Sequence, residues 1–300
     1  MIKYTDEIKR KILDLKIKGF SSRKIAELTG VSKSGVNQYI GTLGKIKPNI
    51  LFVDIETAPS LVYSFDRFNV NIPYTHVKTE GNWIISAAWA WNDSNVESIV
   101  CTPFAAQRQD DSAILSKLYE LYKQADVVVA YNGKKFDFKI IETRFLLNFF
   151  GPAPTVKYYD PYQVAKKLKF NSNKLDAVAN NLNLENKIQN SGINLWIRCM
   201  QGEESALKEM QEYNEQDIVV LRQVYNTIRA FDKSHPNVNL FVQHSEDACT
   251  VCGSLDVVES NRFVYTPAAE SKEYVCNNCG HFHYHKGTKV SKPKQLVNAK

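Results

Sequence analysis

The chain has 300 residues, 44% of them hydrophobic, and a formal net charge of +6. This composition is typical of a folded protein with two or three domains. It argues against a membrane protein, because no stretch approaches the ~20 apolar residues that a span needs. The N-terminus is charged throughout and lacks the apolar segment of a signal peptide. We therefore expect a cytoplasmic protein, in which the six cysteines do not form disulfides.

The positive charge is concentrated at the start of the chain. Residues 1–48 hold nine Lys and two Arg against four acidic residues, a net charge of +7. Residues 233–300 carry +2 and the region between them carries −3. A basic end joined to a slightly acidic centre indicates that the N-terminal part attracts a polyanion.

Residues 5–43 are predicted to form three short helices. Gly19 ends the first, Ser21 or Ser22 caps the second, and Ser32 caps the third after a turn at Gly30. The segment SSRKIAELTGVSKSGVNQYI resembles the helix-turn-helix of recombinases and transcription regulators. That resemblance implies that the third helix enters the DNA major groove. The residues expected to face the DNA are Ser32, Lys33, Ser34, Asn37 and Gln38.

An alternative for this segment is a three-helix unit that docks a protein or only stacks on the rest of the chain. The surplus of Lys and Arg favours DNA. A single helix-turn-helix would bind DNA weakly, because such proteins usually bind two half-sites as a dimer. A homodimer is therefore one expectation. Two Gly, a Pro and two Lys within residues 41–48 indicate a domain boundary.

The pattern after residue 48 predicts a mixed α/β domain with helices on both faces of a sheet. Trp83, Trp89 and Trp91 share one face of an apolar strand and are expected in the core. The expected strands are 50–54, 83–91, 96–101, 127–130 and 156–159, and the expected helices are 111–123, 136–149, 161–168, 175–182 and 203–231.

Two acidic residues end the first of these strands, in the sequence NILFVDIET. Asp54 and Glu56 are two positions apart, so along a strand their side chains point the same way. Neighbouring carboxylates repel each other unless a positive group lies between them. Mg²⁺ and Mn²⁺ prefer such oxygen ligands, and the pair therefore indicates a metal site, although a solvated strand end would look the same.

Two later segments extend this pattern. Asn132 and Phe136-Asp137 follow the strand at 127–130, and Tyr213 and Asp217 lie one turn apart in the long helix. In this order, the three motifs Asp-x-Glu, Asn-x-x-x-Phe-Asp and Tyr-x-x-x-Asp resemble those of the DEDD superfamily of 3'–5' exonucleases. The tyrosine is similar to that of the branch containing the proofreading domains of family B DNA polymerases. The resemblance covers residues 49–232 and implies a ribonuclease H-like sheet.

The resemblance also implies roles for individual residues. Two Mg²⁺ or Mn²⁺ ions would be held, the first by Asp54, Glu56 and Asp217 and the second by Asp54 and, directly or through water, by Asp137. Tyr213 would orient the attacking water, because its ordinary pKa of ~10 is high for a base at neutral pH. Thr57, Asn132 and Phe136 are expected to contact the terminal nucleotide. Asp160 is expected to cap a helix, and Asp176 and His76 are expected at the surface.

The C-terminal region contains four regularly spaced cysteines. Cys249 and Cys252 form one C-x-x-C pair and Cys276 and Cys279 form another, each followed by Gly. This resembles a zinc ribbon, in which four thiolates close a structural Zn²⁺ site. Strand character at 255–258 and 262–265 suits a ribbon. His281, His283 and His285 alternate nearby and could supply spare ligands, although four thiolates suffice for one ion.

The expected domains are a helix-turn-helix at 1–47, a ribonuclease H-like domain at 48–232, a linker with a zinc ribbon at 233–288, and a basic tail at 289–300. The ~68 residues after the core are too few for a polymerase domain, so we expect a separate DNA 3'–5' exonuclease. DNA is the expected substrate, single- or double-stranded, and recruitment to a replication or recombination complex is possible. An exoribonuclease would use the same acids. The remaining alternative is a DNA-binding regulator or recombination accessory protein on a nuclease fold.

Overall fold

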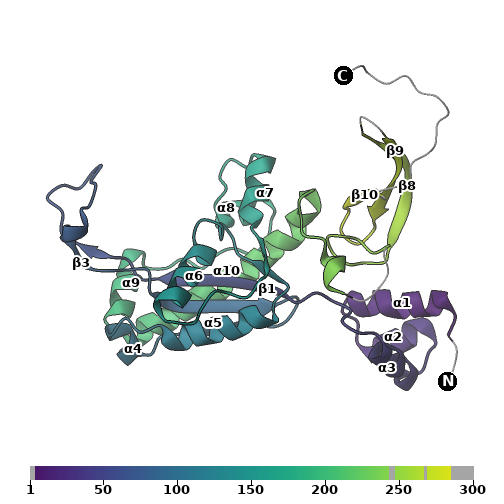
Figure 1. Cartoon of the computed structure of the whole chain (residues 1–300), viewed down its shortest axis with the longest axis horizontal. Coiled ribbons are helices and arrows are strands. Elements are labelled where there is room, and N and C mark those ends of the chain that lie inside the picture. Colours follow the sequence, from purple (N-terminus) through teal and green to yellow (C-terminus); the bar gives the residue numbers. More distant parts are fainter. Residues whose placement is uncertain (1–3, 243–246, 267–268, 285–300) are drawn as a thin grey trace, which may run out of the picture. The chain divides into compact units, whose positions relative to one another are not determined.

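The computed structural model describes residues 4–242, 247–266 and 269–284 and divides into two compact units. The first unit joins both ends of the chain, residues 1–48 and 229–300, and the second is residues 49–228 (Figure 1). The acidic motifs identified in the sequence therefore lie in a unit whose residues are inserted between two segments of the other unit. Within the described residues, no helix is both long and apolar enough to cross a membrane.

The central unit is built on a five-stranded mixed sheet, as the sequence predicts. Its strand order is β5-β4-β1-β6-β7. β1 pairs antiparallel with β4 and parallel with β6, so the sheet changes direction beside β1. The strands of this sheet are β1 (Ile50–Thr57), β4 (Ile84–Trp91), β5 (Glu97–Val100), β6 (Val127–Val129) and β7 (Lys157–Tyr159).

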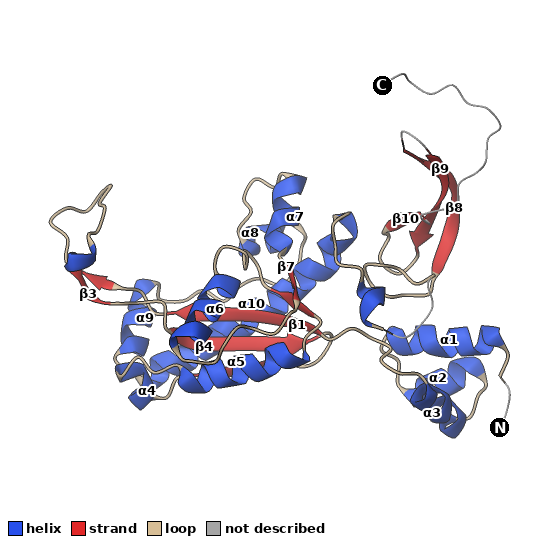
Figure 2. Cartoon of the chain, viewed as in Figure 1, coloured by secondary structure: helices blue, strands red, loops and turns tan. Residues whose placement is uncertain are grey.

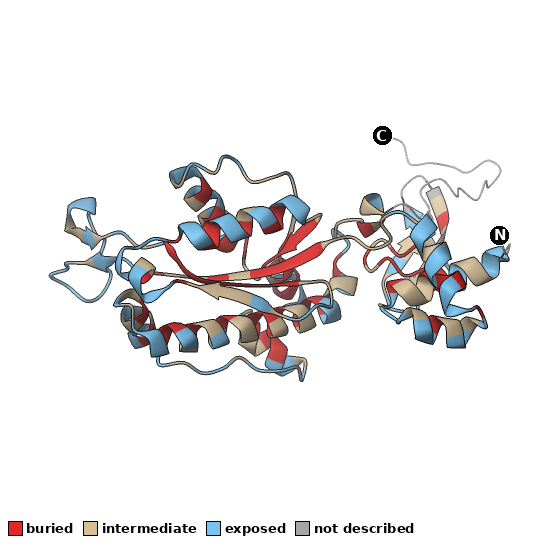
Figure 3. Ribbon diagram, turned by 90° about the horizontal axis from the view of Figure 1, so that it is seen from below, coloured by how far each residue is buried: buried red, intermediate tan, exposed pale blue. Residues whose placement is uncertain are grey.

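Helices cover both faces of this sheet, which is why its central strands β1, β4 and β6 are largely buried (Figure 3). Alternate side chains of β1 point to opposite faces. Leu51, Val53 and Ile55 belong to the core cluster that contains residues of α5 and α6, while Phe52 packs on Tyr225 of α10. The helices of this unit are α4 (Pro103–Gln107), α5 (Ser112–Gln124), α6 (Asp137–Leu147), α7 (Pro161–Leu168), α8 (Leu175–Asn181), α9 (Ile193–Met200) and α10 (Glu204–Ile228).

Several features of the central unit differ from the sequence-based expectation. β1 continues to Thr57 because it stays paired with β4 beyond Asp54, so the two acids lie within the strand. The loop expected after β1 contains a small hairpin of β2 (Leu61–Val62) and β3 (Val77–Thr79), with the 3₁₀ turn η1 (Tyr74–His76). α4 and α9 were not predicted either. Elements of two to eight residues leave little periodicity in a sequence.

The three tryptophans expected in the core of this unit lie in it or pack against it. Trp83 and Trp89 are buried in the core, and Trp91 is half-buried and packs against it.

Asp160 caps α7 by accepting a hydrogen bond from the backbone N–H of Tyr162, as expected from its position. It also supports a loop of the candidate site, described below.

The terminal unit contains a three-helix bundle and a three-stranded sheet (Figure 2). The caps of the bundle are the predicted ones: Ser21 and Ser32 accept backbone hydrogen bonds, and Gly30 has a φ of +69° at the end of the second helix. The elements of this unit are α1 (Asp6–Ile17), α2 (Ser22–Thr29), α3 (Lys33–Thr42), η2 (Arg229–Phe231), η3 (Val238–Phe241), β8 (Val257–Thr266), β9 (Ala269–Cys276) and β10 (Phe282–Tyr284).

The C-terminal sheet has the order β10-β9-β8 and includes the strand segments expected at 255–258 and 262–265, except Leu255 and Asp256, which precede β8. The two segments form one long strand, β8, whose register shifts between Glu259 and Phe263. The segment expected as a linker packs against the cysteine loop: Val238 is buried and its N–H donates to the carbonyl of Thr250 at 2.8 Å. His285 and the basic tail expected at 289–300 lie outside the described residues.

Candidate active site

Three carboxylates converge where β1 faces α10. Asp54 and Glu56 come from β1 and Asp217 comes from α10, and an oxygen of each lies within 4.8 Å of the other two. The i, i+2 spacing points both strand acids toward the same face, to which Phe52 also belongs. Asp217 lies on the buried stripe of α10, beside Ile218. The tertiary structure therefore brings Asp217 together with two acids that precede it in the chain by more than 160 residues.

The site strongly favours the neutral form of its acids. Burial and the negative charge of Asp217 raise the pKa of Asp54 well above its ordinary value. Burial and the same neighbour raise the pKa of Glu56 to about 8, and burial also raises the pKa of Asp217. Burial away from water and repulsion between the carboxylates both raise the pKa values of these acids. A cation held among these carboxylates would favour their charged forms.

A lysine supplies part of that positive charge. Lys187, in the segment between α8 and α9, places its Nζ 2.5 Å from Oδ2 of Asp217 and 3.5 Å from the hydroxyl of Tyr213. The attraction of Asp217 and Asp54 helps raise the pKa of Lys187 above its ordinary value. The ammonium remains protonated and lies beside the acids that a metal ion would bind. The sequence offered no signal for this residue, because it belongs to no periodic element.

An asparagine on α10 fixes the orientation of Asp54. Nδ2 of Asn214 donates to Oδ2 of Asp54 at 2.7 Å, and Oδ1 of Asn214 accepts from the hydroxyl of Ser86 at 2.9 Å. Asn214 and Ser86 are both fully buried. The sequence-based reasoning missed Asn214, although a signal was available: it is a polar residue on the apolar stripe that contains Met210 and Ile218.

Asp137 lies beside this cluster but outside the group of converging oxygens. It is the first residue of α6, and its Oδ1 accepts a hydrogen bond of 3.3 Å from the backbone N–H of Ile55. Its negative charge contributes to the raised pKa of Asp54. Burial raises the pKa of Asp137 itself to about 7. Three of the four predicted acidic ligands therefore place their carboxylates in one cluster, and the fourth, Asp137, lies next to that cluster.

Tyr213 lies one helical turn before Asp217 and faces the same site. Its ring packs edge-on against Trp196 of α9, with 6.3 Å between the ring centroids. Burial and the charge of Asp217 raise the pKa of Tyr213 to about 12. The phenol is therefore neutral at physiological pH and can orient a water molecule, but it is a poor base.

An open groove of about 610 Å³ leads to these residues. Asn132, expected to contact substrate, lines it with a φ of +61°. Its backbone N–H donates to Asp160 at 2.8 Å, which holds this loop in place. Asp176, expected at the surface, is half-buried and also lines the groove. The lining residues are Asp54, Tyr131, Asn132, Tyr162, Asn173, Lys174, Leu175, Asp176, Lys187 and Tyr213.

The other two predicted substrate contacts do not line this groove. Thr57 is half-buried at the end of β1, and Phe136 is 39% exposed immediately before α6. The predicted DNA-facing residues of the bundle, Lys33, Ser34, Asn37 and Gln38, are all exposed on α3. The opposite side of α3 is buried through Gly35 and Val36.

The donor atoms of the acidic site fit a divalent cation. Oδ1 of Asp217 is buried and finds no hydrogen-bond partner among the described residues. A buried carboxylate oxygen without a partner is costly unless another group satisfies it. Mg²⁺ and Mn²⁺ prefer carboxylate oxygens, and three such groups converge here.

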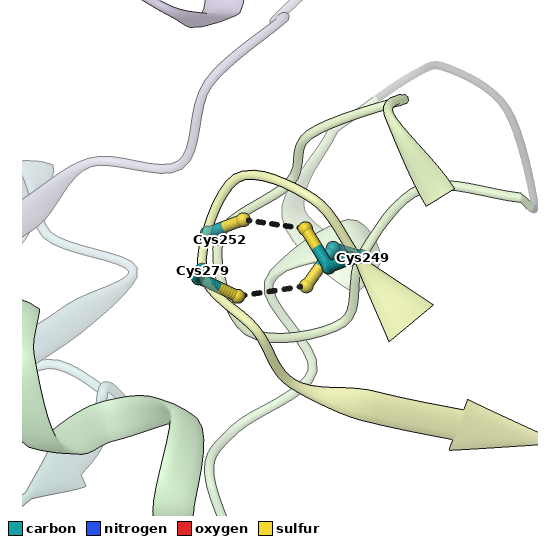
Figure 4. A group of neighbouring side chains, drawn as sticks. Cys249, Cys252 and Cys279 are labelled. Atoms are coloured by element: carbon teal, nitrogen blue, oxygen red, sulfur yellow. Dashed lines mark hydrogen bonds between the residues drawn. The ribbon is translucent and has the colours of Figure 1, made fainter. Parts of the chain in front are cut away.

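The four cysteines form a second candidate metal centre. Figure 4 shows the thiols of Cys249, Cys252 and Cys279 directed toward one another. The sulfurs of Cys249 and Cys279 are 3.6 Å apart, as are those of Cys252 and Cys276. These separations are too long for disulfide bonds of ~2.05 Å. They are close to the ~3.8 Å edge of a tetrahedron with Zn–S bonds of ~2.3 Å, so the thiols fit zinc.

The comparison with known families agrees with this architecture. A sequence profile of the RNase H superfamily matches residues 71–229, which is more than half of the chain. The chain belongs to the RNase H superfamily. Membership points to a nucleic-acid-cleaving hydrolase. The matched region includes Asp137, Tyr213 and Asp217, while Asp54 and Glu56 precede it on β1.

The other two comparisons add little to the family assignment. No curated protein matches the sequence. Among solved structures, the family B DNA polymerase of the hyperthermophilic archaeon Pyrobaculum calidifontis aligns with a TM-score of 0.43 and 14% sequence identity. The alignment covers 61% of this chain and 25% of the polymerase, so the aligned part spans about a quarter of that protein.

Proposed function

We propose that this protein is a metal-dependent 3'–5' exonuclease of the tyrosine-bearing DEDD type, acting on DNA. One observation carries the proposal: Asp54, Glu56 and Asp217 converge within 4.8 Å, with Tyr213 one turn before Asp217. The order of the motifs and the RNase H superfamily fold support it. Three converging acids on an ordinary binding fold would have no reason to bury their charge beside an open groove.

Each residue of the site has a role in this proposal. Asp54, Glu56 and Asp217 would hold one divalent ion, and Asp137 would hold a second together with Asp54. Bound there, such ions lower the pKa of a water molecule and stabilise charge on the attacking and leaving oxygens. The neutral phenol of Tyr213 would orient the water. Thr57, Asn132 and Phe136 would position the terminal nucleotide.

The supporting residues act on the geometry of the acids. Asn214 holds Asp54 in one orientation through its 2.7 Å hydrogen bond. Lys187 partly neutralises the cluster and, beside Asp217, would also face the phosphate of a substrate. The groove lined by Tyr131, Asn132 and Lys174 would receive the strand end. The arrangement thus combines a polar opening with buried acids at its base.

The terminal unit would bring this site to its substrate. The exposed residues of α3 would contact DNA in the manner of a helix-turn-helix, and the four cysteines would hold one structural Zn²⁺. A homodimer would present two α3 helices to two half-sites. A metal assay of the purified protein should return about one zinc per chain, lost when Cys249 and Cys276 are both changed to Ser.

The decisive test compares substrates labelled at either end. Single- and double-stranded DNA and RNA are incubated with Mg²⁺ or Mn²⁺, and product length is followed over time. We expect 5'-labelled DNA to shorten by single nucleotides and 3'-labelled DNA to release a labelled mononucleotide at once. RNA degraded faster than DNA would identify the protein as an exoribonuclease. Internal cuts with both ends left intact would exclude an exonuclease.

Variants assign the activity to this site. Asp54→Asn and Asp217→Asn should abolish nucleotide release while leaving thermal unfolding of the protein unchanged within a few degrees. Glu212→Gln is the matched control, because Glu212 lies on α10 beside Tyr213 but is exposed to solvent. Full activity of the Asp54→Asn protein would refute the two-metal assignment.

A further inference from the structure

Helix α1 is hydrogen-bonded to the segment that follows the first cysteine pair. Oδ1 of Asp14 accepts hydrogen bonds from the hydroxyl of Ser254 and from the backbone N–H of Leu255, both at 3.2 Å. Lys18 lies 2.8 Å from Oδ2 of Asp14 and 3.3 Å from Oδ2 of Asp256. The two partners are about 240 positions apart in the chain, yet both belong to the terminal unit.

Further contacts make this an interface rather than one isolated interaction. The guanidinium of Arg10 donates to the carbonyl of Leu255 at 3.0 Å. The polar contacts therefore surround Leu255, which is itself 4% exposed. Beneath them lies an apolar cluster in which α1 and the cysteine region contribute equally; its buried members are Leu13, Ile17, Ala248 and Leu255, with Leu43 and Ile46 packed against them.

Neither partner has a large core of its own. The bundle spans about 40 residues, a size at which a chain usually needs a metal, a disulfide or a partner to fold. Its separate core consists of four buried side chains, Ile12, Ile25, Val31 and Val36. The cysteine region has an even smaller one, formed by Cys249, Val251 and Cys276. The cluster that contains Leu13 and Leu255 exists only when the two parts are together.

The segment that α1 contacts is shaped by the cysteine loops. The N–H of Gly253 donates to the carbonyl of Cys249, and the N–H of Cys249 donates to the carbonyl of Ser254, both at 2.8 Å. Asn277, in the second loop, donates its backbone N–H to the carbonyl of Asp256 at 2.9 Å. Both loops therefore fix residues 254–256, and the positions of both loops depend on where the thiols are held.

We infer that the four-cysteine centre supports the N-terminal bundle, so that nucleic-acid binding through α3 depends on a metal ion held by the opposite end of the chain. Binding of a metal to such thiols supplies folding free energy. Without it, the loops open, residues 254–256 lose their shape, and Asp14 and Arg10 lose their partners. Leu13 and Ile17 then face water, and a bundle of this size loses order. The structural part rests on the zinc site proposed above, and the DNA-binding part rests in addition on the proposed binding of DNA by α3.

The structural part is tested by hydrogen exchange of the full chain. Zinc-loaded protein is compared with protein stripped by a chelator selective for zinc over magnesium, and peptides from α1 and α5 are followed by mass spectrometry. We expect exchange in α1 to accelerate about tenfold or more, which corresponds to ~1.4 kcal/mol of lost protection. Exchange in α5, in the other unit, should not change. Equal exchange in α1 before and after zinc removal would overturn the inference.

A matched pair of variants tests the interface with the cysteines intact. Asp14→Ala removes the carboxylate that binds Ser254 and Leu255. Asp6→Ala is the control, because Asp6 also pairs with a lysine of α1, at 3.0 Å, but its side chain is 98% exposed. With one zinc per chain retained, Asp14→Ala should accelerate exchange in α1 and Asp6→Ala should not. Unchanged exchange in the Asp14→Ala protein would contradict the inference.

Binding of a labelled DNA duplex of about 20 base pairs, followed by fluorescence anisotropy, separates the two parts of the inference. Zinc removal and Asp14→Ala should each weaken binding about tenfold or more, while Asp6→Ala leaves it unchanged. If α1 loses protection but duplex binding persists, the structural dependence holds and the assignment of binding to α3 is overturned. If exchange and binding are both unaffected, the inference itself fails and the proposed DNA binding by α3 stands.

Discussion

The ammonium of Lys187 lies 2.5 Å from Oδ2 of Asp217, so a positive charge is held against the acids that would bind metal. Asp217 is nearly inaccessible, with 3% of its side chain exposed, while Lys187 retains 23%. Asp217 therefore forms the buried end of this ion pair, and Lys187 forms the end that solvent reaches. A metal ion at the proposed site would compete with Lys187 for the carboxylate of Asp217, so Lys187 is a sensitive probe of that site.

Replacing Lys187 with Met should increase the stabilisation that Mg²⁺ or Mn²⁺ gives the protein. The metal then no longer displaces an ammonium from Asp217, so its apparent affinity at pH 8 rises and the shift in melting temperature on metal addition grows. Differential scanning fluorimetry with and without metal measures that shift. Lys174→Met, which removes an exposed lysine from the same groove, serves as control. Identical metal-induced shifts in the wild type and Lys187→Met would show that the lysine does not compete.

The stability of the metal-free protein should fall as pH rises from about 5 to about 8.5. The ordinary pKa values of Asp and Glu are ~4. Folding raises the pKa of Asp137 to about 7 and that of Glu56 to about 8. Between the ordinary pKa values of the unfolded chain and the raised pKa values of the folded protein, the folded protein holds protons that the unfolded chain has released. The free energy of unfolding therefore decreases as pH rises through this range. Urea denaturation in EDTA at several pH values measures this decrease.

A bound divalent ion should reverse much of that loss, because it replaces the protons on the same acids. Calorimetric titration of metal at pH 7, repeated in two buffers with different ionisation enthalpies, should show protons released on binding. The Glu56→Gln protein should show both a smaller pH dependence and a smaller proton release. A free energy of unfolding that stays flat or rises between pH 6 and 8 in the wild type would contradict the raised pKa values.

Replacing Asn214 with Ala should weaken metal binding without unfolding the protein. Residues that orient metal ligands typically account for 10–100-fold in metal affinity or activity. Here the lost contact is the 2.7 Å hydrogen bond that orients Asp54. Gln211→Ala is the control, because Gln211 also lies on α10 but bonds to Ser98 rather than to an acid of the site. Metal affinity is read from the dependence of nucleotide release on Mg²⁺ concentration, and equal dependence in both variants would remove Asn214 from the site.

Breaking a buried ion pair that lies outside the site should lower the free energy of unfolding without affecting the chemistry of the site. Arg144 donates two hydrogen bonds, of 2.8 and 2.7 Å, to Asp111, whose side chain is fully buried. Arg144→Met leaves that charge without its partner and should lower the free energy of unfolding by about 3–5 kcal/mol. Lys123→Met breaks an exposed pair with Glu120 and should change it by less than about 1 kcal/mol. Urea denaturation distinguishes the two, and a similar small effect of both would show that Asp111 is not held by Arg144.

The sequence predicted the elements whose signals are local. The apolar run of β1, the capping serines of the bundle and the spacing of Tyr213 and Asp217 each depend on a few neighbouring residues. The fold class of the central unit was predicted correctly, and the family comparison agrees with it. The hairpin after β1 and helices α4 and α9 were missed, because elements of so few residues carry almost no periodicity.

By itself, the sequence determined which acids and cysteines are available, and in which order they occur along the chain. Only the tertiary structure decided that Asp54 meets Asn214, that Lys187 reaches Asp217, and that Asp14 binds the loop beside the cysteines. The physical reason is that these contacts join residues far apart in the chain, through side chains whose partners no local pattern specifies. A buried charge must find a partner, but only the folded packing determines which one is within reach.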